Sequence, residues 1–342
     1  MKKKIGNVFK IGFALGLGLL IAWLSLKDLS HQERLSIYQS FKNANYFWVI
    51  ITILLGVLSH FVRALRWKLL LKTSGFNPKN SNTFYSVMVG YFANLGIPRS
   101  GELIRCSLLY KEEKIPVNIS LGTVIIERTF DMLFYVFLFF LTLLLEFQKI
   151  SVYLQTHITS RFREKVDAIS NNWLLLSIVL ILFAGFFALL FVKRKKLLKT
   201  TVGSKIVTFA RGLWAGVISI VKIKNPVLFI IYTLAIWTLY YLMMYLCFFS
   251  LPQTENLGMV AGLSALVMST IGVMITAGGL GLYPVIVANT LVMYGISTSS
   301  QIGLAIGWIA WSAQTIMIIF VGSISLIILS LKIKSNVIQS KN

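Results

Sequence analysis

The sequence predicts an all-α polytopic membrane protein with about six full transmembrane helices plus two re-entrant helical hairpins in an inverted repeat. Hydrophobic residues make up 57% of the 342 residues and charged residues only 13%, whereas a soluble domain carries about 25% charged residues. Several apolar runs are also long enough to cross a bilayer, which takes about 20 residues per crossing. These observations exclude a soluble enzyme and a disordered chain.

Six apolar runs are continuous and predict full spans. The first resembles a secretory signal, but no small-residue cleavage site follows it, so we interpret it as a retained span. Segment 203–224 mixes apolar and basic residues, which is typical of an amphipathic helix on the cytoplasmic surface or of a solvated connecting helix. The six predicted spans cover residues 8–26, 46–71, 116–145, 173–192, 226–250 and 301–331.

Two further apolar segments are interrupted by Gly-rich or Pro-containing sequence. Segment 83–110 is broken at residues 96–101, and segment 257–294 is broken at residues 276–281. Each break leaves two arms of about a dozen residues, and such a helix covers about half of the hydrocarbon core. Because irregular backbone inside a membrane must be buried in protein or line a wet cavity, both segments are predicted to be re-entrant hairpins.

The distribution of basic residues predicts the orientation. The chain carries 33 Lys and Arg against 11 Asp and Glu, a net charge of +22. With the N-terminus inside and neither hairpin crossing, 25 basic residues fall inside, seven fall outside and one lies within a span. Since Lys and Arg concentrate on the cytoplasmic side, we expect a multi-pass protein of the cytoplasmic membrane with both termini in the cytoplasm.

The predicted elements occur twice in the same order. Residues 46–145 and 226–331 each contain a span, a broken hairpin and a long span, and the two units begin on opposite sides of the membrane. Inverted repeats with broken helices are typical of transporters. We expect both units to belong to a single membrane domain covering residues 1–342.

Charged side chains inside membrane segments are costly and commonly mark functional sites. Here they concentrate in and around the first hairpin. Glu127 and Asp131 are four residues apart and share a helix face, while Arg128 can pair with Asp131 three residues later. The candidate substrate-binding residues in this part of the chain are Arg63, Arg66, Asn94, Arg99, Gly101, Glu102, Arg105, Glu127, Arg128 and Asp131.

The charge balance predicts an anionic ligand. Arg99, Glu102 and Arg105 sum to +1 and the charges of the following span sum to −1, so the two sets can neutralise each other. Arg63 and Arg66 then leave +2 near the inner membrane boundary. Guanidinium groups bind phosphate through two parallel hydrogen bonds, and the helix start after the break suits an anion. A structural ion-pair network with snorkelling arginines is the alternative.

The second hairpin contrasts with the first, because residues 256–331 contain no Asp, Glu, Lys or Arg. Its break contains Gly278, Gly279 and Gly281, which predict an uncharged gate or a weak headgroup site, with close helix packing as the alternative. Cys106 and Cys247 are expected to be packing residues. No metal site, cofactor or catalytic residue is expected.

The sequence GYFANLGIPRSGELIR, followed by IIERTFD and preceded by RALRW, resembles the flippase-like integral membrane family of the transmembrane region of lysylphosphatidylglycerol synthases. The late GGLG adds to this resemblance, which covers about residues 5–331. It implies an inner-membrane protein that moves or handles polar lipids. Ala277 and Tyr283 depart from the Pro and the acidic residue that the family often has there. Only 11 residues follow Leu331, so the chain is not expected to synthesise lysylphosphatidylglycerol by itself.

We therefore expect a lipid translocase that handles an anionic phospholipid or a polyprenyl-phosphate lipid. A membrane-embedded enzyme or transferase subunit that uses Glu127 or Asp131 on a lipid headgroup is the alternative, and a membrane scaffold is a third. The expected partners are membrane lipids and not nucleic acid. A homo-oligomer and a partner lipid-modifying enzyme are both left open.

Overall fold

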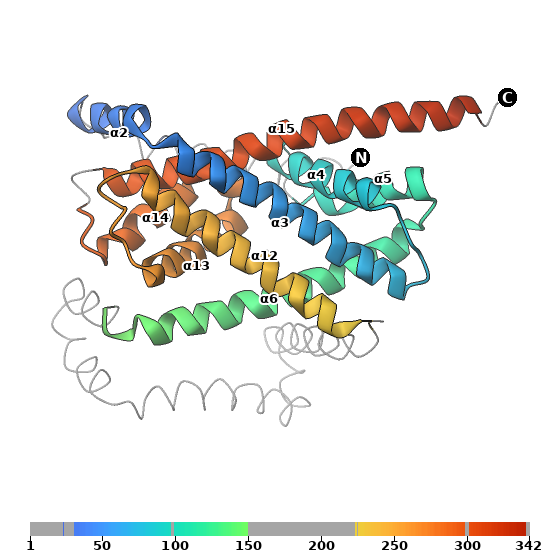
Figure 1. Cartoon of the computed structure of the whole chain (residues 1–342), viewed down its shortest axis with the longest axis horizontal. Coiled ribbons are helices and arrows are strands. Elements are labelled where there is room, and N and C mark those ends of the chain that lie inside the picture. The colour runs from blue at the N-terminus through green and yellow to red at the C-terminus, as the bar shows by residue number, and fades with distance from the viewer. Residues whose placement is uncertain are drawn as a thin grey trace, which may run out of the picture. The chain divides into compact units, whose positions relative to one another are not determined.

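The computed structural model describes residues 23, 31–96, 99–149, 223, 225–297 and 301–339, and this part of the chain is helical without any β-strand (Figure 1). Two short 3₁₀ helices, η2 (Phe248–Ser250) and η3 (Ala277–Gly279), accompany the α-helices. The α-helices are α2 (His31–Asn43), α3 (Tyr46–Thr73), α4 (Asn80–Gly96), α5 (Gly101–Glu113), α6 (Val117–Leu145), α12 (Pro226–Cys247), α13 (Met259–Ile275), α14 (Leu282–Val292) and α15 (Ile302–Gln339).

Four helices in the described residues are long and apolar enough to cross a membrane. They correspond to α3, α6, α12 with η2, and α15 as far as Lys332. Four of the six predicted spans are therefore confirmed as span-length apolar helices. The other two, 8–26 and 173–192, and the amphipathic segment 203–224 lie almost wholly outside the described residues.

The two interrupted segments form pairs of short helices. The breaks fall where the sequence predicts them, because α4 ends at Gly96 and α5 begins at Gly101, while α13 ends at Ile275 and α14 begins at Leu282. The predicted arm length is wrong for the first helix of each pair, since α4 and α13 both have 17 residues. Such a helix is about 25 Å long. The apolar pattern misses the polar first turn of α4, which begins at Asn80.

The chain divides into two compact units, and the boundary falls within α6 after Ile125. One unit comprises residues 1–125 and 223–342, and the other comprises residues 126–222. The expectation of a single membrane domain stays a prediction.

Within the first unit, α3 packs along α12, and the short helices pack in pairs as α4 with α5 and α13 with α14. The long helix α15 contacts members of both pairs, and Figure 1 shows it running past them. A buried core gathers around Trp67, whose indole Nε1 donates a hydrogen bond to Thr123 Oγ1 at 2.9 Å. Cys106 belongs to this core, and Cys247 is likewise fully buried. Both cysteines are free thiols, which agrees with the predicted packing role.

Candidate functional site

Three arginine side chains of the first unit are buried. The exposed fractions are 2% for Arg63, 0% for Arg66 and 2% for Arg105. A snorkelling arginine keeps its charged end in contact with water, so the snorkelling alternative is wrong for Arg63 and Arg66. Lys68, two residues after Arg66 on α3, is partly exposed and donates to Asn80 Oδ1 at 2.6 Å.

Arg63 lies between two tyrosine rings. Its guanidinium carbon is 5.9 Å from the ring centroids of both Tyr91 on α4 and Tyr240 on α12. Its Nη2 atom also donates a hydrogen bond to the Tyr240 hydroxyl at 3.2 Å. The buried imidazole of His60, one turn earlier on α3, lies against the Tyr91 ring, with 4.3 Å between the two ring centroids. Aromatic faces attract a cation without removing its charge.

Arg66 and Arg105 have similar surroundings. Arg66 donates from Nη1 to Thr233 Oγ1 at 3.0 Å, and its guanidinium carbon lies 5.5 Å from the centroid of the Phe229 ring. The guanidinium carbon of Arg105 lies 4.6 Å from the ring centroid of Trp67, the residue next to Arg66 on α3. Helices α3, α4 and α12 thus place rings and hydroxyl groups against the three cations, and we call Arg63, Arg66 and Arg105 the buried arginine group.

Asn94 and Gly101 hold the first helix pair together. Asn94 Oδ1 accepts a hydrogen bond from the Gly101 amide at 2.7 Å, so this amide at the start of α5 is already engaged within the protein. A Cβ atom on Gly101 would lie 2.7 Å from the carbonyl carbon of Gly90 and 2.8 Å from Asn94 Cγ. Helices α4 and α5 therefore approach so closely that only glycine fits. A headgroup contact at Asn94 or Gly101 stays a prediction.

The other two charged candidates near this break are less buried. Arg99 is exposed and has a φ angle of 63°, while Glu102 lies half-buried in the first turn of α5. The side chain of Arg99 is therefore exposed, unlike the side chains of the buried arginine group.

The second unit contains the remaining charged candidates, all on α6. Glu127 is 0% exposed and Asp131 is 9% exposed, as expected for residues that share a helix face. Arg128 Nη1 lies 3.7 Å from Asp131 Oδ2, which confirms the predicted pair within the helix. The expected pairing of Glu127 with Arg105 of the first unit stays a prediction.

The glycines of the second hairpin form a tight reversal between α13 and α14. Gly278, Gly279 and Gly281 have φ angles of 60°, 81° and 72°, which residues with a side chain rarely adopt. The Gly278 carbonyl accepts a hydrogen bond from Trp311 Nε1 at 2.9 Å. A Cβ atom on Gly278 would lie 3.1 Å from Leu95 Cδ2, near the end of α4. The reversal of the second pair thus meets the end of the first pair.

Several residues of this arrangement were not selected from the sequence. Tyr91, Tyr240 and Thr233 contact the buried arginine group, and Trp311 binds the glycine reversal. The spacing of Phe229, Thr233 and Tyr240 places them along one face of a helix, so a search of residues 226–247 for aromatic and polar positions at helical spacing would have found this face.

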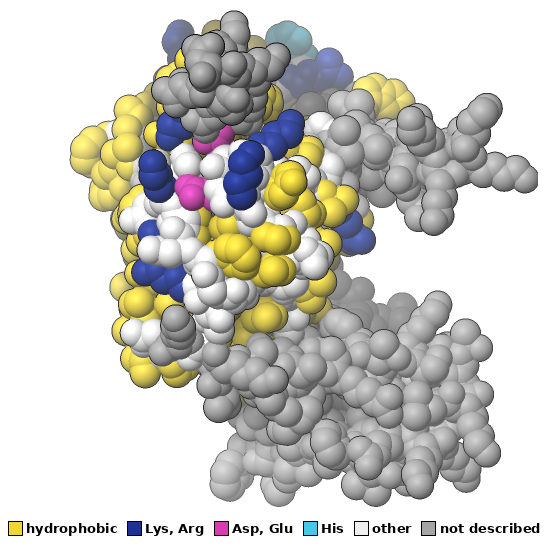
Figure 2. Space-filling view, turned by 90° about the vertical axis from the view of Figure 1, so that its right-hand side faces the viewer, with side chains coloured by type: hydrophobic (Ala, Val, Ile, Leu, Met, Phe, Trp, Pro, Cys, Tyr) yellow, Lys and Arg dark blue, Asp and Glu magenta, His cyan; other side chains and the backbone are white. Residues whose placement is uncertain are grey.

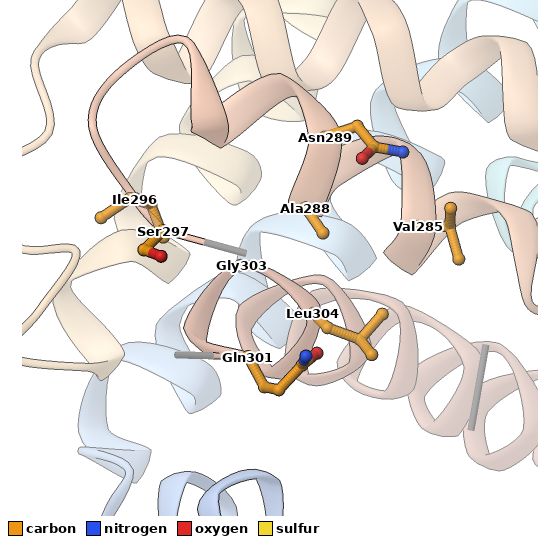
Figure 3. Close-up of a pocket in the computed structure, with 8 residues that line it drawn as sticks. All are labelled: Val285, Ala288, Asn289, Ile296, Ser297, Gln301, Gly303 and Leu304. Atoms are coloured by element: carbon orange, nitrogen blue, oxygen red, sulfur yellow. The ribbon is translucent and has the colours of Figure 1, made fainter. Parts of the chain in front are cut away.

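A small cavity lies elsewhere in the first unit, between α14, the loop after it and the start of α15 (Figure 3). Its volume is about 220 Å³, and none of the described residues that line it carries a charge. Its polar groups are Asn289, Ser297 and Gln301. Ligand pockets typically measure 300–1,000 Å³, and guanidinium groups bind phosphate through paired hydrogen bonds, so the buried arginine group is the better candidate for an anion.

The fold and the buried charges define a polytopic membrane protein whose interior carries guanidinium groups. A family model described as the lysylphosphatidylglycerol synthase TM region matches residues 8–322, and the chain belongs to this family. A UPF0104 membrane protein from Methanocaldococcus jannaschii is 35% identical over 101 residues, which cover 29% of this chain and 30% of that relative. The chain therefore matches less than a third of the length of this relative. No solved structure matches the chain.

Proposed function

We propose that this protein is a lipid translocase that moves a phosphate-bearing lipid, an anionic phospholipid or a polyprenyl phosphate, between the leaflets of the cytoplasmic membrane. The burial of three guanidinium groups among membrane helices is the observation that carries this proposal. The family match supports a role that involves lipids.

The energetic cost of these arginines supports a functional role. An arginine at the centre of a membrane helix costs about 2.5–3.5 kcal/mol on insertion scales, and the cost falls toward the membrane boundary. Helix α3 carries two arginines in its second half, Arg63 and Arg66, and both are buried. Rings and hydroxyl groups are among the groups that stabilise these cations. A phosphate diester would add opposite charge and accept paired hydrogen bonds from a guanidinium. In this proposal the lipid phosphate approaches Arg63 and Arg66, and the carboxylates of Glu102, Glu127 and Asp131 alternate with it as partners of the arginines.

The arrangement of the helices supports movement rather than binding alone. A long helix, two short helices and a long helix follow one another twice in the described chain, as α3–α6 and as α12–α15. We take the two sets to be inverted repeats with re-entrant pairs, as in transporters that alternate access around a central site. The contact between Leu95 and Gly278 then joins the moving parts, with the glycine reversal serving as an uncharged gate.

Two neighbouring tyrosines of α12 allow a matched test of the arginine site. Tyr240→Phe removes the hydroxyl that accepts from Arg63 while keeping the ring, and we expect slower translocation of a labelled phosphate-bearing lipid in liposomes. Tyr241→Phe serves as the control, because that hydroxyl donates to the Met259 carbonyl instead. Arg63→Gln should slow translocation further, because it removes the charge itself.

The readout is fluorescence loss when a labelled lipid reaches the outer leaflet and meets an external quencher. Equal rates for wild type, Tyr240→Phe and Arg63→Gln, with folded protein in each case, would exclude the buried arginine group from the transport site. A retained binding of phosphate-bearing lipid without any movement would favour the alternative of a subunit that acts on lipid headgroups.

A further inference from the structure

Six lysines gather at one end of the first unit, where α3 and α5 end, α4 begins and α15 carries Lys332. Figure 2 faces this end and shows Lys and Arg side chains grouped around acidic ones. Lys72, Lys79, Lys111 and Lys114 are exposed, and the other two are partly exposed. We call this set the lysine rim, and its members are Lys68, Lys72, Lys79, Lys111, Lys114 and Lys332.

Hydrogen bonds fix the framework of the lysine rim. Lys332 Nζ donates to Asn82 Oδ1 at 2.9 Å and lies 5.3 Å from the ring centroid of Tyr85. The Asn82 amide in turn donates to Glu113 Oε1 at 2.7 Å, and the backbone amide of Lys79 donates to the same carboxylate oxygen at 3.0 Å. Helices α4, α5 and α15 are thereby joined at this end, so the lysines occupy defined positions.

The lysine rim carries a surplus of positive charge. Six lysines face two carboxylates, Glu112 and Glu113, so the local balance is 6 − 2 = +4. In the part of the chain that the structure describes, none of the six lysines has a carboxylate oxygen within 4 Å of its ammonium nitrogen. A surface of this charge attracts anions from its surroundings.

The surfaces next to the lysine rim are apolar. On α3, Leu58 is 46% exposed and Phe61 is 39% exposed, and on α5, Leu103 is 54% exposed. Tyr110, in the last turns of α5 beside the lysines, is 50% exposed. An apolar helix surface that is followed by a tyrosine and then by lysines is typical of a helix that leaves the hydrocarbon core at the headgroup layer.

We propose that the lysine rim binds anionic phospholipid headgroups of the leaflet that surrounds this end of the protein, as a site separate from the buried arginine group. The charge surplus selects anionic over zwitterionic headgroups, and the adjacent apolar faces place the rim at the depth of the phosphates. The site gathers anionic lipid around the protein, and it does so whether or not the protein translocates lipid.

Lipid retention measures this site without any transport step. The full chain, purified from mixed micelles that contain equal amounts of phosphatidylglycerol and phosphatidylcholine, is analysed for co-purified lipid by native mass spectrometry. Wild type should retain an excess of phosphatidylglycerol that decreases as sodium chloride is raised. The combined variant Lys72→Gln, Lys79→Gln and Lys111→Gln should lose this excess, with a decrease of about fivefold in relative affinity per lysine.

Two control variants separate charge from folding. Arginine at the same three positions keeps the charge and should keep the excess, and Lys42→Gln on α2 should leave it unchanged. An unchanged phosphatidylglycerol excess in the glutamine variant overturns the proposal and leaves an acidic protein partner as the occupant of the rim. If that variant does not fold, a wild-type excess that is insensitive to salt overturns it equally. Loss of translocation with normal retention would instead concern the buried arginine group.

Discussion

The close contact between α4 and α5 predicts opposite effects for two glycine-to-alanine substitutions. A Cβ on Gly101 would lie 2.7 Å from the Gly90 carbonyl carbon, whereas a Cβ on Gly122 of α6 would meet nothing within 4 Å. Gly101→Ala forces the two helices apart, which costs about 1–3 kcal/mol for overpacking, and weakening the Asn94 hydrogen bond adds about 0.5–1.5 kcal/mol. Gly122→Ala improves helix propensity and should stabilise by about 0.5–1 kcal/mol.

The assay is unfolding of the purified protein in mixed micelles with increasing sodium dodecyl sulfate, followed by tryptophan fluorescence. Gly101→Ala should lower the unfolding midpoint and Gly122→Ala should raise it or leave it in place. Gly90→Ala should resemble Gly101→Ala, because its Cβ would lie 2.9 Å from the Gly101 carbonyl oxygen. If Gly101→Ala is as stable as wild type, the close approach of α4 and α5 is refuted, and with it the packing role assigned to Gly101.

Three further predictions concern other parts of the chain. Arg105→Ala and Glu127→Ala should each destabilise by about 3–5 kcal/mol if they share the network that the sequence predicts, and additive losses in the double variant would show that they do not couple. Trp311→Phe removes the hydrogen bond to Gly278 and should speed amide exchange of residues 276–281, whereas Trp308→Phe on the same helix should not; equal exchange in both variants would argue against this bond. Burial raises the pKa of the Glu112 carboxyl above its usual value. The charge of Lys332 lowers this pKa, and the charge of Glu113 raises it. The folded state then holds this proton more tightly than the unfolded state, so the stability of wild type relative to Glu112→Gln should fall as the pH rises from 4 to 7 in thermal unfolding; a constant difference would contradict the shift.

The helical framework was predictable because the apolar pattern is strong in a membrane protein. The breaks at residues 96–101 and 276–281 were predicted correctly, since glycine interrupts an otherwise apolar run in both segments and Pro98 adds to the first break. The start of α4 at Asn80 was missed because its first turn is polar and pairs with neighbouring helices through Asn82. Hydropathy does not register polar residues whose hydrogen bonds are satisfied by tertiary contacts.

The candidate site was only partly predictable. Charge marked Arg63, Arg66 and Arg105 in the sequence, but their burial depends on rings that other helices supply. Tyr240 lies 177 residues from Arg63 along the chain, and a single sequence does not indicate such a pairing. Asn94 was selected as a candidate headgroup ligand, which stays a prediction, but the sequence did not indicate that its side-chain carbonyl oxygen accepts a hydrogen bond from the Gly101 amide.

The central claim is that the buried arginine group recognises the phosphate of a lipid during its movement between leaflets. The most direct measurement compares two labelled lipids of similar tail length in liposomes that contain the purified full chain, one with a phosphate headgroup and one a phosphate-free glycolipid. The account predicts that the phosphate-bearing lipid reaches an external quencher faster than in empty liposomes, while the glycolipid stays at the empty-liposome rate. Movement of both lipids at equal rates, or of neither with folded protein, would contradict the account.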